Sequence, residues 1–297
     1  MTMHRVIPLI VCAALVLAAS SARAAYAAGS QPLRIGLTPV FLDDQDAFLN
    51  TWRGYLQRRL GRPVQFYKRG TYREISEMLR QGKLDFAWTC GLPYVRHREF
   101  MHLVAMPVYR GKPLYQSYLI VPATDTTTQS LADLRGKVFA FSDPDSNSGF
   151  LYPNYTLARR GESAGTFFRK TFFTWAHRKV VEAVASGLAQ GGAVDGYVWD
   201  TLRLYHPDLI SKTRVVQKSP EFGHTPVVAR STVARADARA LQRVLVEMAA
   251  DEEGRQLLRR LNLDGFVVGS DRLFDGIAAM ATVVDGATAT GAGGTGS

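Results

Sequence analysis

The chain contains very little cysteine and histidine, and this excludes several kinds of stabilising site. Only two cysteines, Cys12 and Cys90, and six histidines occur in 297 residues. Two cysteines cannot build a disulfide framework or a four-cysteine zinc site. His97 and His102 are the only close pair of histidines, and their spacing does not place them on one helical face. We therefore expect no metal and no cofactor. The apolar residues, 46% of the chain, suffice for a sizeable core.

Long apolar runs are also absent, except for one near the start of the chain. His4 and Arg5 precede an apolar run from Val6 to Ala19, and small residues follow it. This order is typical of a secretory signal peptide. A membrane anchor is the competing interpretation, but the run is shorter than the roughly 20 residues that a spanning helix needs. We expect residues 1–28 to be a signal peptide, cleaved between Ala24 and Ala28, and the mature protein to be exported.

Basic residues outnumber acidic ones, and the formal net charge is +10 at pH 7. Lys and Arg are spread along the whole sequence and are not interleaved with aromatic residues. The charge therefore favours an anionic partner only weakly, and solubility is the simpler explanation of it. We do not expect the protein to bind nucleic acid.

The periodicity of apolar residues predicts alternating strands and helices in the first part of the mature chain. Predicted strands cover 33–37, 63–66 and 84–88, and predicted helices cover 44–60 and a segment that begins with a capping box at 71–74. This order predicts a parallel sheet with helices on its faces. A similar pattern at 192–199 indicates a second lobe of the same α/β build.

Two extended stretches, 115–123 and 225–229, are interpreted as crossovers between the lobes. We therefore expect the first lobe to comprise residues 31–120 and 226–280, and the second lobe to comprise residues 121–225. Residues 281–297 are rich in Ala, Thr and Gly and are expected to form a disordered tail.

Residues 138–149 carry the most informative pattern in the sequence. A predicted strand ends at Phe141, an Asp-Pro-Asp turn follows, and a helix is expected to begin near Ser148. Ser146, Asn147 and Ser148 would then stand where backbone N–H groups and the helix dipole attract an anion. Ordinary N-capping is the alternative explanation, but one polar residue suffices for a cap.

This segment resembles a motif of a known family. Residues 143–149, Asp-Pro-Asp-Ser-Asn-Ser-Gly, are similar to the D-P-x-S-[ST]-S-G motif of substrate-binding proteins of phosphonate, phosphite and phosphate ABC transporters. Residues 85–95, 176–187 and 194–200 resemble three further motifs of the family, in the same order. The resemblance implies a type II periplasmic binding protein fold. Two α/β lobes with mixed, mostly parallel sheets and helices on both faces would be joined by two crossover strands.

The resemblance also implies a set of residues that would bind the solute. These are Ser146, Asn147, Ser148, Gly149, His177, Asp200, Tyr94 and Tyr72. The residues of the motif would hold the oxygens of an anion, and His177 would donate one more hydrogen bond. The two tyrosines would line the site from the first lobe, and Asp200 would accept a hydrogen bond from a protonated oxygen or an amine. Asn147 departs from the family pattern, which has Ser or Thr there.

The expected function is that of a periplasmic, monomeric receptor with no catalytic activity. It would bind a phosphonate-, phosphite- or phosphate-like oxyanion between the lobes and deliver it to the permease of an ABC transporter. An exported sensory or accessory protein on the same fold is the alternative, as is a binder of another small anion such as a sulfonate or carboxylate. Ser148, His177 and Asp200 could be combined into a hydrolase triad, but Ser148 lacks the G-x-S-x-G context of such a nucleophile.

Overall fold

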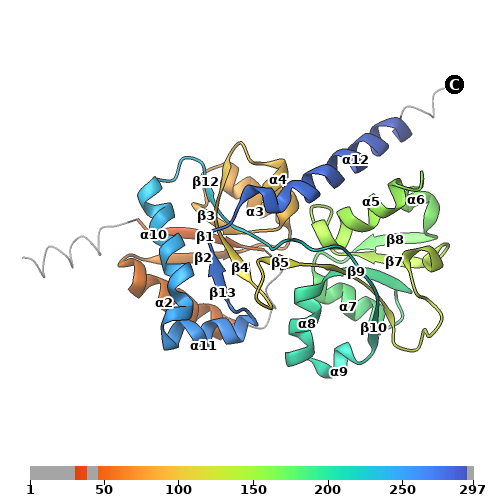
Figure 1. Ribbon diagram of the computed structural model, residues 1–297, viewed down its shortest axis with the longest axis horizontal. Coiled ribbons are helices and arrows are strands. Elements are labelled where there is room, and N and C mark those ends of the chain that lie inside the picture. Colours follow the sequence, from red (N-terminus) through yellow and green to blue (C-terminus); the bar gives the residue numbers. More distant parts are fainter. Residues whose placement is uncertain (1–30, 39–45, 293–297) are drawn as a thin grey trace, which may run out of the picture.

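Two mixed β-sheets form the centres of two lobes that lie side by side (Figure 1). The computed structural model describes residues 31–38 and 46–292. The expected signal peptide and the last five residues of the expected tail lie outside the described residues. Within the described ranges, no helix combines the length and the apolar character that crossing a membrane requires.

The first lobe contains a six-stranded sheet with the strand order β13-β4-β12-β3-β1-β2. β1 pairs in parallel with β2 and β3, whereas β12 and β13 pair antiparallel to their neighbours. The strands of this lobe are β1 (Leu33–Leu37), β2 (Val64–Lys68), β3 (Phe86–Trp88), β4 (Met101–Val108), β12 (Val227–Arg230) and β13 (Gly265–Val267). Its helices are α2 (Asp46–Leu60), α3 (Tyr72–Arg80), α4 (Gly91–Arg96), α10 (Arg235–Val246), α11 (Glu252–Leu261) and α12 (Asp275–Ala292).

The second lobe contains a five-stranded sheet with the order β10-β6-β9-β7-β8, in which β7 pairs in parallel with β8 and β9. Its strands are β6 (Ser117–Pro122), β7 (Val138–Phe141), β8 (Lys170–Phe173), β9 (Gly191–Asp195) and β10 (Thr213–Lys218). Its helices are α5 (Tyr152–Ala158), α6 (Ala164–Phe167), α7 (His177–Ala185), α8 (Gly196–Tyr205) and α9 (Pro207–Ile210). The chain crosses between the lobes twice, and the short strands β5 (Leu114–Tyr115) and β11 (Phe222–Gly223) of the two crossovers pair with each other.

The predicted elements of the first lobe are confirmed, because their sequence signals act locally. The apolar stripe of α2 is buried, and Gly61, with a φ of 65°, adopts the left-handed conformation that ends the helix. Thr71 caps α3, since its Oγ1 accepts a hydrogen bond from the backbone N–H of Glu74 at 3.1 Å. The predicted return strand is β12, which lies between β3 and β4.

The first crossover ends earlier than the sequence indicated. β6 pairs with β9 and β10, so residues 117–120 belong to the second-lobe sheet and not to the first lobe. The crossover strand consists of Leu114 and Tyr115 only. These two residues pair with β11, whereas β6 begins at Ser117 and pairs within the second-lobe sheet.

The expectation of a disordered tail from residue 281 is wrong for the described part of that segment. α12 extends from Asp275 to Ala292 and lies over α5 of the second lobe (Figure 1). Ile277, Ala281 and Val284 are at most 8% exposed and belong to the same apolar cluster as Leu151 of the second lobe. The Ala- and Thr-rich composition was interpreted as a sign of disorder, although Ala favours helices. The larger apolar residues of the segment lie on one face, which is the pattern of an amphipathic helix.

We predict that Ile277→Ala lowers the free energy of unfolding by about 2–4 kcal/mol, since it removes a fully buried side chain and leaves a cavity. The control is Val283→Ala on the same helix. Val283 is 38% exposed, so its truncation is expected to cost at most about 0.5 kcal/mol. Urea denaturation measures both values. Two equally small effects would contradict the packing of α12 described above.

Candidate ligand-binding site

The Ser-Asn-Ser segment begins a helix, as predicted, and lies where the two lobes meet. A π-helical turn, Asn147–Leu151, continues directly into α5, and Ser146 caps it by accepting a hydrogen bond from Gly149 N–H at 3.0 Å. Ser146, Asn147 and Ser148 are at most 1% exposed. π-Helical turns of this kind occur frequently at functional sites.

Asn147 connects this turn to the other parts of the chain that line the lobe interface. Its backbone N–H donates to Sγ of Cys90 in the first lobe at 3.3 Å, and its Nδ2 donates to the hydroxyl of Tyr115 in the first crossover at 2.9 Å. Burial raises the pKa of Cys90 to about 11, so this side chain remains a neutral thiol. The turn is therefore buried between the lobes and not inside the core of one lobe.

Gly149 permits a close approach that no other residue type allows. A Cβ at this position would lie 2.0 Å from Oγ of Ser142 and 3.1 Å from Cε1 of His177. The glycine thus brings the end of β7, the π-helical turn and the start of α7 into contact. Three segments of the second lobe converge on one point.

His177 reaches this point as a neutral hydrogen-bonding group. Its Nδ1 accepts a hydrogen bond from the backbone N–H of Asp195 at 3.1 Å, so the ring proton resides on Nε2. Nε2 lies 3.3 Å from the hydroxyl of Tyr72, which comes from α3 of the first lobe. Burial lowers the pKa of His177 to about 3 and raises that of Tyr72 well above its usual value. Both groups are therefore neutral near pH 7, and the tyrosine hydroxyl keeps its proton for donation.

Several polar atoms in this cluster make no hydrogen bond of good geometry with the described residues. They are Oγ of Ser142, Oγ of Ser148 and Oδ1 of Asn147, and all three residues are at most 1% exposed. A buried polar group without a partner costs about 1–3 kcal/mol, and native proteins contain few of them. Three such atoms around one point indicate a binding site for a polar ligand.

The electrostatic character of the cluster is unusual for an anion site. Two buried carboxyl groups, Asp143 and Asp195, adjoin it, and burial raises the pKa of both, that of Asp195 to about 7. Within the described part of the chain, no Lys or Arg side chain is hydrogen-bonded to the three unpartnered atoms. The unpartnered atoms therefore belong to uncharged hydroxyl and amide groups.

The turn before the Ser-Asn-Ser segment also carries contacts that hold the lobes together. Asp143 accepts a hydrogen bond from the backbone N–H of Tyr72 at 3.2 Å. Asp145 lies 3.3 Å from the guanidinium of Arg96 and 3.7 Å from that of Arg73, both in the first lobe. Arg96 also pairs with Asp285 of α12 at 2.9 Å. The two aspartates of the Asp-Pro-Asp turn thus contact the opposite lobe.

Two of the expected ligand-binding residues have other partners. Asp200 accepts hydrogen bonds from the hydroxyls of Tyr109 at 2.8 Å and Tyr118 at 3.0 Å, and it pairs with Arg110 at 3.2 Å. Tyr94 donates to Asp271, within the first lobe. The structure therefore brings together the motif residues, His177 and Tyr72, but gives Asp200 and Tyr94 partners within the protein. A ligand contact of either residue stays a prediction.

The sequence interpretation missed Ser142, Asp143, Asp195 and Tyr115 as members of the cluster. Asp195 had a visible signal, because it is the last residue of β9 and caps α8 by accepting from Tyr197 N–H at 2.8 Å. Asp200 lies further along α8, so the residue that contacts His177 is Asp195, through its backbone N–H. Tyr115 had no signal, since only the crossover geometry places it beside Asn147.

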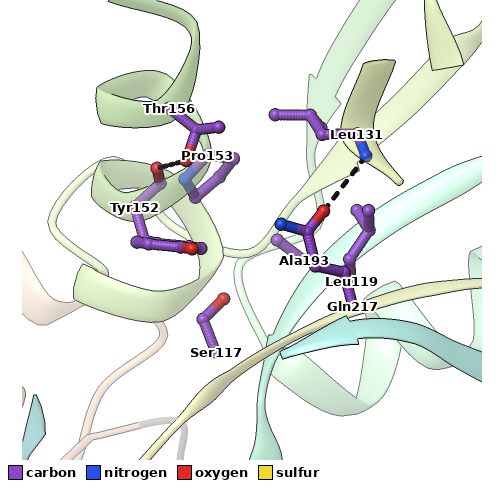
Figure 2. A pocket seen from close by; sticks show the side chains of 8 residues that line it. All are labelled: Ser117, Leu119, Leu131, Tyr152, Pro153, Thr156, Ala193 and Gln217. Atoms are coloured by element: carbon purple, nitrogen blue, oxygen red, sulfur yellow. Dashed lines mark hydrogen bonds between the residues drawn. The ribbon is translucent and has the colours of Figure 1, made fainter. Parts of the chain in front are cut away.

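The backbone of the turn is fixed from behind by the second-lobe sheet. Oγ of Ser117 in β6 donates to the carbonyl of Ser148 at 2.7 Å. Ser117 also lines a small cavity of about 20 Å³, which Figure 2 shows between α5 and the sheet. This volume fits about one water molecule, so the cavity is too small for a solute. No group of His, Cys, Asp and Glu in residues 31–38 and 46–292 is placed to hold a metal ion.

Two α/β lobes, two crossovers and a buried polar cluster between the lobes define a periplasmic binding protein. Solved structures agree with this class. A binding protein component of an ABC phosphonate transporter from Pseudomonas aeruginosa superimposes with a TM-score of 0.81, at 21% identity, over 90% of this chain and 91% of that chain. PhnD1 from Prochlorococcus marinus, solved in complex with methylphosphonate, gives a TM-score of 0.77, at 21% identity, over 85% of this chain and 98% of that one.

The chain belongs to the family described as "ABC transporter, phosphonate, periplasmic substrate-binding protein", whose model matches residues 35–274. The phosphonates-binding periplasmic protein of Escherichia coli (strain K12) is 26% identical over 262 residues, which cover 79% of this chain and 76% of that protein. The expected family and the expected two-lobe fold are therefore confirmed, and the protein is the substrate-binding component of an ABC transporter.

The raised pKa of Asp195 predicts a measurable effect of pH on stability. Its pKa is about 7 in the folded protein and 3.8 in the unfolded chain, so between about pH 4 and pH 7 the folded state retains a proton that the unfolded state has lost. The free energy of unfolding therefore falls as the pH rises through this window, by a few kcal/mol at most, at about 1.4 kcal/mol per pKa unit.

The test compares urea denaturation of the wild type and Asp195→Asn at pH 4.5 and pH 7.5. Asn preserves the helix cap and removes the titration, so the variant is expected to gain stability relative to the wild type as the pH rises. His177, whose pKa is lowered, acts in the opposite direction, but it is present in both proteins and cancels in the comparison. An unchanged difference between the two proteins at both pH values would contradict the prediction.

Proposed function

We propose that the mature chain binds a small tetrahedral oxyanion, such as a phosphonate, phosphite or phosphate, where its two lobes meet. The observation that carries this proposal is the pair of buried, unpartnered hydroxyl groups of Ser142 and Ser148. A tetrahedral anion offers several acceptors within a small volume, which suits hydroxyl donors that converge from different segments. The named ligands of the relatives, phosphonates and methylphosphonate, are of this class.

The residues of the cluster divide the binding between the two lobes. The hydroxyls of Ser142 and Ser148 donate from the second lobe, and the hydroxyl of Tyr72 donates from the first. His177 donates from Nε2 to the oxygen of Tyr72, and this hydrogen bond orients the tyrosine hydroxyl toward the anion. Gly149 keeps Ser142 and His177 close enough to act on one ligand.

Binding of this kind is coupled to closure of the lobes. Donors from both lobes reach one anion only when the lobes are together, so the ligand has a higher affinity for the closed state and shifts the population toward it. The contacts of Asp145 with Arg73 and Arg96 form only in the closed arrangement and add to its stability. The closed, liganded protein is the form that we propose the permease recognises.

The cluster supports binding and not catalysis. A general base works best with a pKa near the working pH, whereas His177 has a pKa of about 3. Asp200, which would orient the histidine in a triad, is hydrogen-bonded to Tyr109 and Tyr118 instead. We propose that the protein acts as a monomer without catalytic turnover and does not bind nucleic acid. We also propose that residues 1–28 are cleaved on export to the periplasm, the compartment in which the E. coli relative is named.

The decisive experiment is isothermal titration of the mature chain, residues 29–297, with phosphate, phosphite, methylphosphonate and sulfate. We expect at least one of the three phosphorus oxyanions to bind, and Ser148→Ala to weaken it tenfold or more, since a hydrogen bond to a charged group contributes about 1.5–3 kcal/mol. The unliganded variant is expected to be as stable as the wild type, because the substitution removes an unpartnered buried hydroxyl.

The matched control is Ser211→Ala, which changes an exposed serine of the same lobe and is expected to leave the affinity unchanged. An affinity that is equal in Ser148→Ala and the wild type would place the ligand elsewhere. The absence of binding by all three phosphorus oxyanions would contradict the proposed ligand class.

A further inference from the structure

His224 is a fully buried histidine with one unpaired ring nitrogen. It lies in the second crossover, between β11 and β12, and is 0% exposed. Its Nδ1 accepts a hydrogen bond from the backbone N–H of Thr225 at 2.8 Å and lies 2.9 Å from Oγ1 of the same residue. A backbone N–H only donates, so Nδ1 carries no proton, and the proton of the neutral ring resides on Nε2. Burial lowers the pKa of His224 to about 3, so the ring is neutral.

Nε2 of His224 is a buried donor that has no hydrogen-bond partner among the described residues. The ring lies among three tyrosines. The distances between ring centroids are 5.0 Å to Tyr197, 5.5 Å to Tyr115 and 6.5 Å to Tyr109. The hydroxyl of Tyr197 donates to Leu261 and that of Tyr109 donates to Asp200. Neither hydroxyl oxygen accepts a hydrogen bond from Nε2 of His224.

Tyr115 connects His224 to the ligand-binding cluster. The ring of Tyr115 packs on His224. Its hydroxyl accepts a hydrogen bond from Nδ2 of Asn147. Tyr115 also adjoins Ser148. The crossover histidine thus adjoins Tyr115, a member of the buried cluster, from the second crossover.

We propose that Nε2–H of His224 donates to an acceptor atom of the ligand on the face that points away from Ser142 and Ser148. This inference rests on the proposed function and specifies the ligand of that same site. A tetrahedral phosphate presents a fourth oxygen to this face, whereas methylphosphonate presents a methyl group. The site therefore selects phosphate, or a phosphonate whose substituent carries an oxygen, over methylphosphonate.

The physical basis of the selection is the cost of leaving a buried donor unpaired. With phosphate bound, the N–H of His224 meets an anionic oxygen. With methylphosphonate bound, the methyl group excludes water and gives the donor no acceptor. Sites that are built to hydrogen-bond one group of a ligand discriminate strongly against an analogue that lacks it.

The test is isothermal titration of phosphate and methylphosphonate, at one pH, into the mature wild type and two variants of His224. His224→Asn keeps an acceptor near the position of Nδ1 for the Thr225 N–H but lacks the distal donor. His224→Gln places an amide N–H near the position of Nε2. We expect the wild type to bind phosphate at least tenfold more tightly than methylphosphonate. His224→Asn is expected to reduce this ratio of affinities to about threefold or less, mainly by weakening the binding of phosphate. His224→Gln is expected to keep a higher ratio than His224→Asn.

The outcomes separate this inference from the proposed function. The inference would be overturned if the wild type bound methylphosphonate as tightly as phosphate or more tightly. It would also be overturned if His224→Asn lowered the affinity for both ligands equally, which is what a packing role of His224 predicts. Either result would leave the oxyanion site itself standing. If neither ligand nor phosphite binds the wild type, the proposed function fails and the inference fails with it.

Discussion

Burial of hydroxyl groups without a partner is costly, and this protein concentrates several of them at the meeting point of its lobes. Oγ of Ser142 and Oγ of Ser148 lie in adjoining segments there, and Gly149 allows the close approach of Ser142 and His177. The surrounding backbone is fixed by Ser146, which caps the turn, and by Ser117, which anchors the carbonyl of Ser148. The scaffold thus holds unpaired donors in place, and a ligand that accepts hydrogen bonds recovers the cost.

The second feature of the site is that, in the described part of the chain, no Lys or Arg side chain is hydrogen-bonded to its unpartnered atoms. The imidazole of His177 is neutral because burial lowers its pKa, and burial raises the pKa of the adjoining carboxyl groups of Asp143 and Asp195. We propose that hydrogen-bond donors, and not the net charge of +10, recognise the ligand. Recognition by neutral donors depends on the number and direction of acceptors on the ligand, so shape and hydrogen-bonding pattern decide specificity more than total charge does.

Local signals in the sequence predicted the parts of the structure that local interactions determine. The Thr71 cap, the apolar stripe of α2 and the helix start at Asn147 all follow from residues within one or two turns of each other. Long-range contacts were not predictable in this way. α12 is stabilised by α5 of the other lobe, the backbone N–H of Asp195 reaches His177 because of where β9 ends, and His224 packs on the ring of Tyr115. A family motif predicted the second-lobe residues of the candidate site, whereas the crossover residues depend on how the lobes assemble.

The most direct test of this account is a crystal structure of the mature chain with a bound phosphorus oxyanion. The account predicts that the anion lies between the lobes, with its oxygens within hydrogen-bond distance of Oγ of Ser142, Oγ of Ser148 and the hydroxyl of Tyr72. An anion bound elsewhere, with the two serine hydroxyls still unpaired, would contradict it.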